Sequence, residues 1–200
     1  MAPSLWPHTT PGIVDQLFER LPGIPMSKRE VRVLMLSQLR LCCDSVLWDI
    51  GAGTGTIPVE VGLLCPQGQV IAVERDGEVV KLIHRNCDRF GVTNVSVIEG
   101  NAPDCLSSLT TTPTHVIVEG GRPIKTILQA TWERLGNQGR ILATTNTLEG
   151  LYTISESFAE LQVRHVEVVQ TSVNRLEKRG NHQTFAALDP TFILSGEKLA

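Results

Sequence analysis

The sequence predicts an α/β fold in which helices cover both faces of a mostly parallel sheet. Short apolar runs alternate with longer amphipathic segments from residue 45 to residue 161, and glycines separate them. The pattern changes afterwards, because 163–173 and 184–194 are two strand-like runs around a polar loop. We therefore expect a seven-stranded sheet whose last two strands form an antiparallel pair at its edge.

The first residues predict an extension of the domain rather than a part of its core. Residues 1–12 contain three prolines and are expected to be flexible. A short helix is expected at 13–20, followed by an extended connector at 21–25, because proline restricts its own backbone and that of the preceding residue. We expect a lead-in at 1–22 and a single domain at 23–200.

A helix is predicted to begin after Ser27. Serine is a good N-cap residue, and Glu30 three residues later would complete a capping box. The expected buried face of this helix contains Val31, Leu34, Met35 and Leu39.

Strands and helices then alternate. Strands are expected at 45–50, 69–74, 95–99, 114–119 and 139–144, and helices at 56–64, 77–90, 122–135 and 148–161. The last helix places five apolar side chains at helical spacing: Leu148, Leu151, Ile154, Phe158 and Leu161.

The most informative segment is the glycine-rich turn after the first strand. Asp49 comes directly before Gly51, Gly53 and Gly55, and glycine allows a sharp turn with no side chain between backbone and ligand. Glu74 ends the next strand, where a carboxylate can accept both hydroxyls of a ribose. A dinucleotide fingerprint would need a small residue where Thr56 stands. The spacing instead resembles motif I of class I S-adenosylmethionine-dependent methyltransferases.

In a parallel sheet of this kind, ligands bind outside the carboxyl ends of the strands. We therefore expect five segments to converge on one cleft: Asp49 to Gly55, Glu74, Gly100 to Ala102, Glu119 to Arg122 and Thr144 to Glu149.

Composition narrows the classes of function. The net charge of −3 provides no broad basic field, so we expect no nucleic-acid partner. Five cysteines without a C-x-x-C pair favour a reducing compartment, and no metal-ligand spacing is present. Without a signal peptide or a long apolar run, we expect a cytoplasmic protein with no membrane partner.

Further segments resemble one family, the cobalt-precorrin (or precorrin) carbon-15 methyltransferases (decarboxylating) of cobalamin biosynthesis. The similar strings are Gly-Ile-Pro-Met-Ser-Lys-Arg-Glu-Val-Arg at 23–32, Trp-Asp-Ile-Gly-Ala-Gly-Thr-Gly at 48–55, 89–95, 99–103, 147–149 and 187–196. The first and last are the discriminating ones. Two departures are Asn101, where the family usually has aspartate, and 119–123, where it often has a longer glycine-serine run.

The resemblance implies a Rossmann-like class I methyltransferase fold and S-adenosyl-L-methionine as cofactor. It implies methyl transfer to carbon 15 of a precorrin, with loss of carbon dioxide from the ring C acetate. The implied cofactor-binding residues are Ser27, Asp49, Gly51, Ala52, Gly53, Thr54, Gly55, Glu74, Asn101 and Ala102. The catalytic residues, including the proton donor, are not identified by the sequence.

The implied substrate is a flat polyanion, so its pocket needs arginine and lysine. Basic clusters occur at Lys28/Arg29/Arg32, Arg122/Lys125 and Arg175/Lys178/Arg179. The candidate substrate-binding residues are Gly120, Gly121, Arg122, Glu149, Arg175, Lys178 and Arg179. Each charged residue has a plain alternative as part of a solvated surface, and Glu149 as the acidic residue in the first turn of a helix. His182 in the polar loop is either a proton donor or a surface histidine.

Two other functions stay open at this level. The alternative enzyme is a class I methyltransferase acting on RNA or protein, and the alternative from another class is a nonenzymatic cofactor-binding subunit. A separate carbon-5 precorrin methyltransferase and a second copy of the chain are the possible protein partners.

Overall fold

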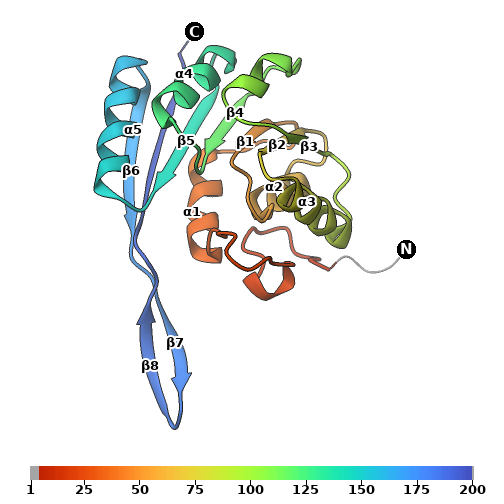
Figure 1. Cartoon of the computed structure of the whole chain (residues 1–200), viewed down its shortest axis with the longest axis vertical. Coiled ribbons are helices and arrows are strands. Elements are labelled where there is room, and N and C mark those ends of the chain that lie inside the picture. The colour runs from red at the N-terminus through yellow and green to blue at the C-terminus, as the bar shows by residue number, and fades with distance from the viewer. Residues whose placement is uncertain (1–4, 200) are drawn as a thin grey trace.

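The computed structural model, which describes residues 5–199, contains a seven-stranded sheet between two layers of helices (Figure 1). The strand order is β3-β2-β1-β4-β5-β9-β6. The first five strands are parallel, and β9 runs antiparallel to its neighbours β5 and β6. These strands are β1 (Val46–Ile50), β2 (Gln69–Glu74), β3 (Val95–Glu99), β4 (His115–Val118), β5 (Arg140–Thr145), β6 (Arg164–Thr171) and β9 (Thr191–Glu197). The predicted fold class is confirmed.

The helices divide between the two faces of the sheet. Helices α1 (Arg29–Leu39), α2 (Thr56–Leu64) and α3 (Gly77–Phe90) pack on one face, and α4 (Ile124–Arg134) and α5 (Leu148–Glu160) pack on the other. Two 3-10 helices, η1 (Asp15–Leu17) and η2 (Asp104–Ser108), lie in connections. No helix within residues 5–199 is both long and apolar enough to cross a bilayer.

Burial on both faces explains why the strands are continuous apolar runs. On one face of the sheet, Trp48 and Ile50 belong to the core that includes residues of α4 and α5. On the other face, Leu47 belongs to the core that includes residues of α1 and α2. All three side chains are at most 2% exposed. The two cores fix the register of β1, because a shift by one residue would exchange its two faces.

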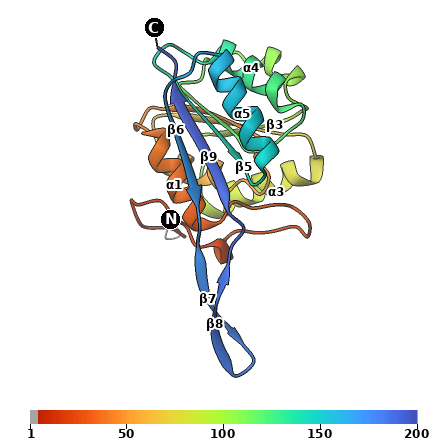
Figure 2. The ribbon, with the colours of Figure 1, turned by 90° about the vertical axis from the view of Figure 1, so that its left-hand side faces the viewer.

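The C-terminal part differs from the predicted strand pair. The run at 184–194 divides between β8 (His182–Ala187) and β9, and the expected polar loop is instead a hairpin of β7 (Asn174–Arg179) with β8. Figure 2 shows this hairpin projecting from the body of the molecule. Its strands are mostly exposed, with Leu176 opposite Phe185, so no buried face marks them in the sequence.

Three local predictions were wrong. The short helix at 13–20 is only the three-residue η1. Helix α1 begins at Arg29 after Lys28, so Ser27 does not cap it. Leu34 is exposed, so it does not share the buried face of α1 with Val31, Met35 and Leu39.

Residues 12–28, which we call the N-terminal strap, pack against the domain. Ile13 and Phe18 are buried in the core beside α3, together with Met26. The strap therefore belongs to the folded body for most of its length, although part of it falls within the lead-in expected at 1–22. Residues 1–4 of that lead-in lie outside the described residues.

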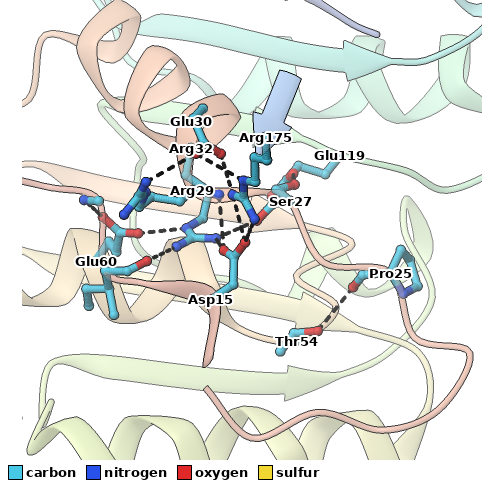
Figure 3. Close-up of polar contacts among 12 residues, drawn as sticks. Asp15, Pro25, Ser27, Arg29, Glu30, Arg32, Thr54, Glu60, Glu119 and Arg175 are labelled. Atoms are coloured by element: carbon cyan, nitrogen blue, oxygen red, sulfur yellow. Dashed lines mark hydrogen bonds and ion pairs between the residues drawn. The ribbon is translucent and has the colours of Figure 1, made fainter. Parts of the chain in front are cut away.

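Arg32 on α1 holds the strap through a buried ion-pair network (Figure 3). Its side chain is fully buried, Nε donates to Glu60 Oε1 at 2.7 Å, and Nη1 donates to Asp15 Oδ1 at 2.8 Å. Nη1 also donates to the Ser27 carbonyl oxygen at 2.5 Å. Since Glu60 in turn accepts from the Gly12 N–H at 2.6 Å, both ends of the strap depend on one guanidinium.

We predict that Arg32→Met lowers the free energy of unfolding by about 3–5 kcal/mol, because it leaves the buried Glu60 carboxylate without its cation and Asp15 with Arg175 alone. Arg40→Met is the control, since Arg40 pairs with Glu167 and Glu197 while its own side chain is 58% exposed. That variant should lose less than about 1 kcal/mol. Urea unfolding measures both values, and equal losses would contradict the assigned role of Arg32.

Candidate active site

The carboxyl ends of β1, β2, β3 and β4 meet at one edge of the sheet. The N–H groups of Gly51 and Ala52 both donate to the Val73 carbonyl, at 2.9 and 3.1 Å. The Gly100 N–H donates to Glu74 and the Glu119 N–H to Ile50. The predicted convergence is confirmed for these segments, and it falls where the strand order reverses between β2, β1 and β4.

Three carboxyl groups share one face of this edge. Asp49 lies opposite Ala72 on β2 and Ile117 on β4 in the parallel register. Glu74 and Glu119 come two residues after those partners, so their side chains are on the same face as Asp49. This is the face covered by the strap and α1.

The glycine-rich turn provides a backbone surface beside these acids. Gly51, Gly53 and Gly55 have φ angles of +81°, +53° and +80°, which disfavour any residue with a side chain. A Cβ on Gly51 would come within 3.4 Å of the Gly120 nitrogen, and one on Gly55 within 3.0 Å of Ile83. The turn leads directly into α2, so the positive end of that helix lies at this edge of the sheet.

Asp49 is a buried carboxyl group that lacks a donor from the protein. It is 0% exposed, and neither of its oxygens accepts a hydrogen bond from any residue of the described chain. Burial raises its pKa well above the usual value, and the nearby charges of Glu119 and Glu74 add to the effect. A buried acid of this kind fits a ligand that brings its own ammonium group.

Glu74 is held as an acceptor at the end of β2. Its Oε2 accepts from the Gly53 N–H at 3.1 Å, and its Oε1 accepts from the N–H groups of Arg75 and Asp76 at 2.8 and 3.2 Å. These bonds orient the carboxyl group beside the turn, where it fits a ribose. Past the end of β3, Asn101 is exposed and Ala102 is buried.

The strap packs beside the carboxyl edge of the sheet. Thr54 donates its hydroxyl to the Pro25 carbonyl at 3.1 Å, and the Ser27 hydroxyl donates to Glu119 Oε2 (Figure 3). Sequence reasoning assigned no role to Glu119. The signal was an acidic residue between the apolar β4 and two glycines, two residues beyond the β4 partner of Asp49.

The expected substrate-binding residues fall into two groups. Gly120, Gly121 and Arg122 follow β4, and Glu149 lies in the first turn of α5, so these residues stand at the carboxyl edge. Gly121, Arg122 and Glu149 are exposed. Lys178 and Arg179 are exposed on the β7–β8 hairpin, as is His182.

Arg175 is part of the ion-pair network instead of a free cation. Its Nη1 and Nη2 both lie 3.0 Å from Asp15 Oδ2, and Nε donates to Glu30 Oε1 at 3.1 Å. Arg32 is likewise enclosed by Asp15 and Glu60, which removes it from the basic cluster expected with Lys28 and Arg29. Lys125 pairs with Glu160 at 2.8 Å.

A parallel sheet of this order, with an unpartnered acid before a glycine-rich turn and a second acid ending β2, defines a Rossmann-like methyltransferase. A family model described as a precorrin methyltransferase domain matches residues 18–198. The chain belongs to this family of precorrin methyltransferases.

Relatives and solved structures agree with this assignment. The chain is 40% identical over 192 residues to a probable cobalt-precorrin-6B C(15)-methyltransferase (decarboxylating) of Pyrobaculum calidifontis, covering 95% of this chain and 97% of that protein. The corresponding protein of Salmonella typhimurium is 31% identical, with 92% and 95% covered. The crystal structure of a precorrin-6y C5,15-methyltransferase from Geobacter metallireducens superposes with a TM-score of 0.87 at 32% identity, covering 94% of this chain and 97% of that one.

The Arg175 contacts predict a loss of stability in acid. The Arg175 hydrogen bond lowers the pKa of Glu30 from 4.5 to about 2. Burial acts to raise the pKa of Asp15, but Arg32 and Arg175 outweigh it and the net shift is downward. Because both folded pKa values are lowered, the stabilisation is present above the unfolded values and is lost as the pH falls toward 2.

In Arg175→Met, the pH dependence of unfolding should become shallower below pH 4.5 than in the parent. The matched control is Arg179→Met, since Arg179 is 69% exposed and lies 3.7 Å from Glu177. Thermal unfolding in a pH series measures this. The same slope in parent and Arg175→Met would show that the Arg175 contacts do not stabilise the fold.

Proposed function

We propose that the chain transfers a methyl group from S-adenosyl-L-methionine to carbon 15 of a precorrin, or of its cobalt complex, and removes carbon dioxide from the ring C acetate. Family membership supports this reaction, since relatives bear the name of that activity. The single observation that carries the proposal is the buried Asp49 carboxyl group with no protein donor, at the sheet edge where the strand order reverses.

The residues at this edge suit the parts of the proposed cofactor. Asp49 would accept from its ammonium, and Glu74 from its two ribose hydroxyls. Asn101 and Ala102 would border the adenine, where the Asn101 amide oxygen can accept from the amino group. When bound, the cofactor supplies a methyl group that is already activated as a sulfonium.

Two further parts of the site would border the cofactor. The backbone of Gly51, Ala52, Gly53, Thr54 and Gly55 would pass close beside it, as the positive φ angles of the three glycines suggest. Ser27 would lie near the methionine end, on the strap. The protein then has to hold the acceptor carbon in line with the methyl group and exclude water.

For the substrate, we propose that Arg122 binds a carboxylate of the macrocycle and that Gly120 and Gly121 allow close approach. On the α5 side, the flat ring would be bordered by Glu149 and by two exposed apolar residues. These are Leu148 and Tyr152, which are both 70% exposed. Large exposed apolar side chains at a cleft edge are suited to such a ring.

Lys178 and Arg179 would bind further carboxylates from the hairpin, either of the same subunit or of a second copy. We assign Arg175 a scaffolding role, because its donors are already taken by Asp15 and Glu30.

The proposed reaction belongs in the cytoplasm, in agreement with the five free cysteines. Carbon-5 methylation would be supplied by a separate enzyme.

The direct test is to incubate the purified chain with labelled S-adenosylmethionine and a precorrin extract. The expected product has gained one labelled methyl group and lost one carbon dioxide, as seen by mass spectrometry. A labelled RNA or protein with an unchanged tetrapyrrole would refute the proposal and favour the alternative substrates.

Cofactor affinity should depend on Glu74. We predict that Glu74→Ala weakens binding of S-adenosylhomocysteine by roughly 2 kcal/mol or more, since a two-hydroxyl acceptor is lost. Glu78→Ala is the control, because Glu78 is exposed on α3 and pairs only with Lys81 among the described residues. Calorimetry measures both affinities, and an unchanged value for folded Glu74→Ala would reject the ribose assignment.

The hairpin cations should act on substrate and not on cofactor. We predict that Lys178→Ala/Arg179→Ala raises the tetrapyrrole KM about tenfold, from charge-assisted bonds discounted for exposure. Its affinity for S-adenosylhomocysteine should equal that of the parent. Added salt should raise KM more in the parent than in the double variant. If KM and its salt response both stay unchanged, these residues are only a solvated surface.

A further inference from the structure

We propose that Glu119 is the acid that protonates the substrate carbon released by decarboxylation. This inference rests on the proposed function, which requires a proton donor that the sequence alone did not identify. It concerns a residue of this chain at the carboxyl edge of the sheet.

The position of Glu119 supports contact with substrate. It directly follows β4, and its N–H donates to the Ile50 carbonyl at 3.1 Å, beside the start of the glycine-rich turn. Glu119 as a residue is partly exposed, whereas Asp49 on the neighbouring strand is fully buried. The residues after it, Gly120 to Arg122, are the ones proposed to border the macrocycle. Glu119 therefore stands between the cofactor turn and the substrate side.

The surroundings of Glu119 favour its neutral acid form. Burial raises its pKa, and the Ser27 hydrogen bond and the charge of Arg32 oppose this without reversing it. The other titratable groups facing the site are Asp49 on β1 and Glu74 on β2, both acidic. A ligand ammonium at Asp49 would favour the ionised form of that group, and the negative charge of Asp49 would further favour the neutral form of Glu119.

Ser27 fixes the orientation of the acid. Its hydroxyl donates to Oε2, which leaves Oε1 to carry the proton (Figure 3). The Ser27 carbonyl is in turn held by Arg32, whose guanidinium is buried in the ion-pair network. This support holds the carboxyl group in place without supplying a full counter-charge.

The other acids of the cleft are less suited to the task. Asp49 is 0% exposed and lies behind the turn, out of reach of a bulky substrate. Glu74 accepts three backbone N–H bonds, so both of its oxygens are already engaged as acceptors. Glu149 is exposed in the first turn of α5.

The proton balances the reaction. The bond between the acetate methylene and its carboxylate breaks, carbon dioxide leaves, and the electron pair passes into the conjugated macrocycle. A new C–H bond then forms at the former methylene carbon with the proton of Glu119, which converts the acetate into a methyl group. Glu119 regains its proton from solvent, and no oxidant or reductant is needed.

The test compares Glu119→Gln with the parent in both partial reactions. Mass spectrometry separates the methylated tetrapyrrole that keeps its acetate from the methylated, decarboxylated product. We expect formation of the decarboxylated product to fall about 100-fold, as on loss of a general acid, while methyl transfer and S-adenosylhomocysteine affinity stay near the parent values. In the parent, decarboxylation should slow as the pH rises through the pKa of Glu119, and this limb should be absent from the variant.

Glu119→Asp, which keeps an acid, should restore part of the decarboxylation, and Glu133→Gln on the outer surface of α4 is the control for an acid-to-amide change. Equal loss of both partial reactions in Glu119→Gln would overturn the proposal and make the residue a positioning one. An unchanged product ratio would also overturn it. A parent that modifies no tetrapyrrole would refute the proposed function itself, and this inference with it.

Discussion

Three acidic side chains on one face of a sheet edge are the constraint on which this structure depends. The parallel register places Glu74, Asp49 and Glu119 together, and the core behind them prevents a shift of the strands. Buried like charges are costly, so the site needs either protons or a cation. The same cost raises the pKa of Asp49, mainly through burial and further through the neighbouring charges of Glu119 and Glu74. A cofactor that carries an ammonium group and two ribose hydroxyls would offset this cost, because it brings a cation and hydrogen-bond donors that the protein itself does not provide.

Arg32 connects this edge to the outer parts of the molecule. Its guanidinium holds Asp15 and Glu60, and Asp15 in turn accepts from Arg175 at the base of the hairpin. The strap, helices α1 and α2 and the β7–β8 hairpin are thus joined by one ion-pair network (Figure 3). Such a network contributes specificity of arrangement more than net stability, because desolvation offsets much of the attraction. The position of Ser27 beside Glu119 depends on this arrangement.

The sequence predicted the repeated part of the fold well because burial on both faces leaves a strong local signal. Helices α2 and α3 have the predicted bounds, and the glycine-rich turn and Asp49 lie where its spacing indicated. Prediction from the sequence failed where a residue's role depends on partners far away in the chain. Ser27 looked like a helix cap, but its hydroxyl bonds Glu119, which is 92 residues away in sequence. Arg175 looked like a free cation, yet its partners lie in the strap and α1, and no local pattern could indicate them.

The most direct test of the account is whether cofactor binding releases a proton from Asp49. Calorimetric titration with S-adenosylhomocysteine, in buffers of different ionisation enthalpy and at a mildly acidic pH where the ligand amino group is fully charged, measures that number. The account predicts release of a proton by the parent, because the ligand ammonium lowers the raised pKa of the buried carboxyl group. Asp49→Asn should bind more weakly and release none. Binding by the parent with the same enthalpy in every buffer would contradict the account, since Asp49 would then not be the group that receives the ammonium.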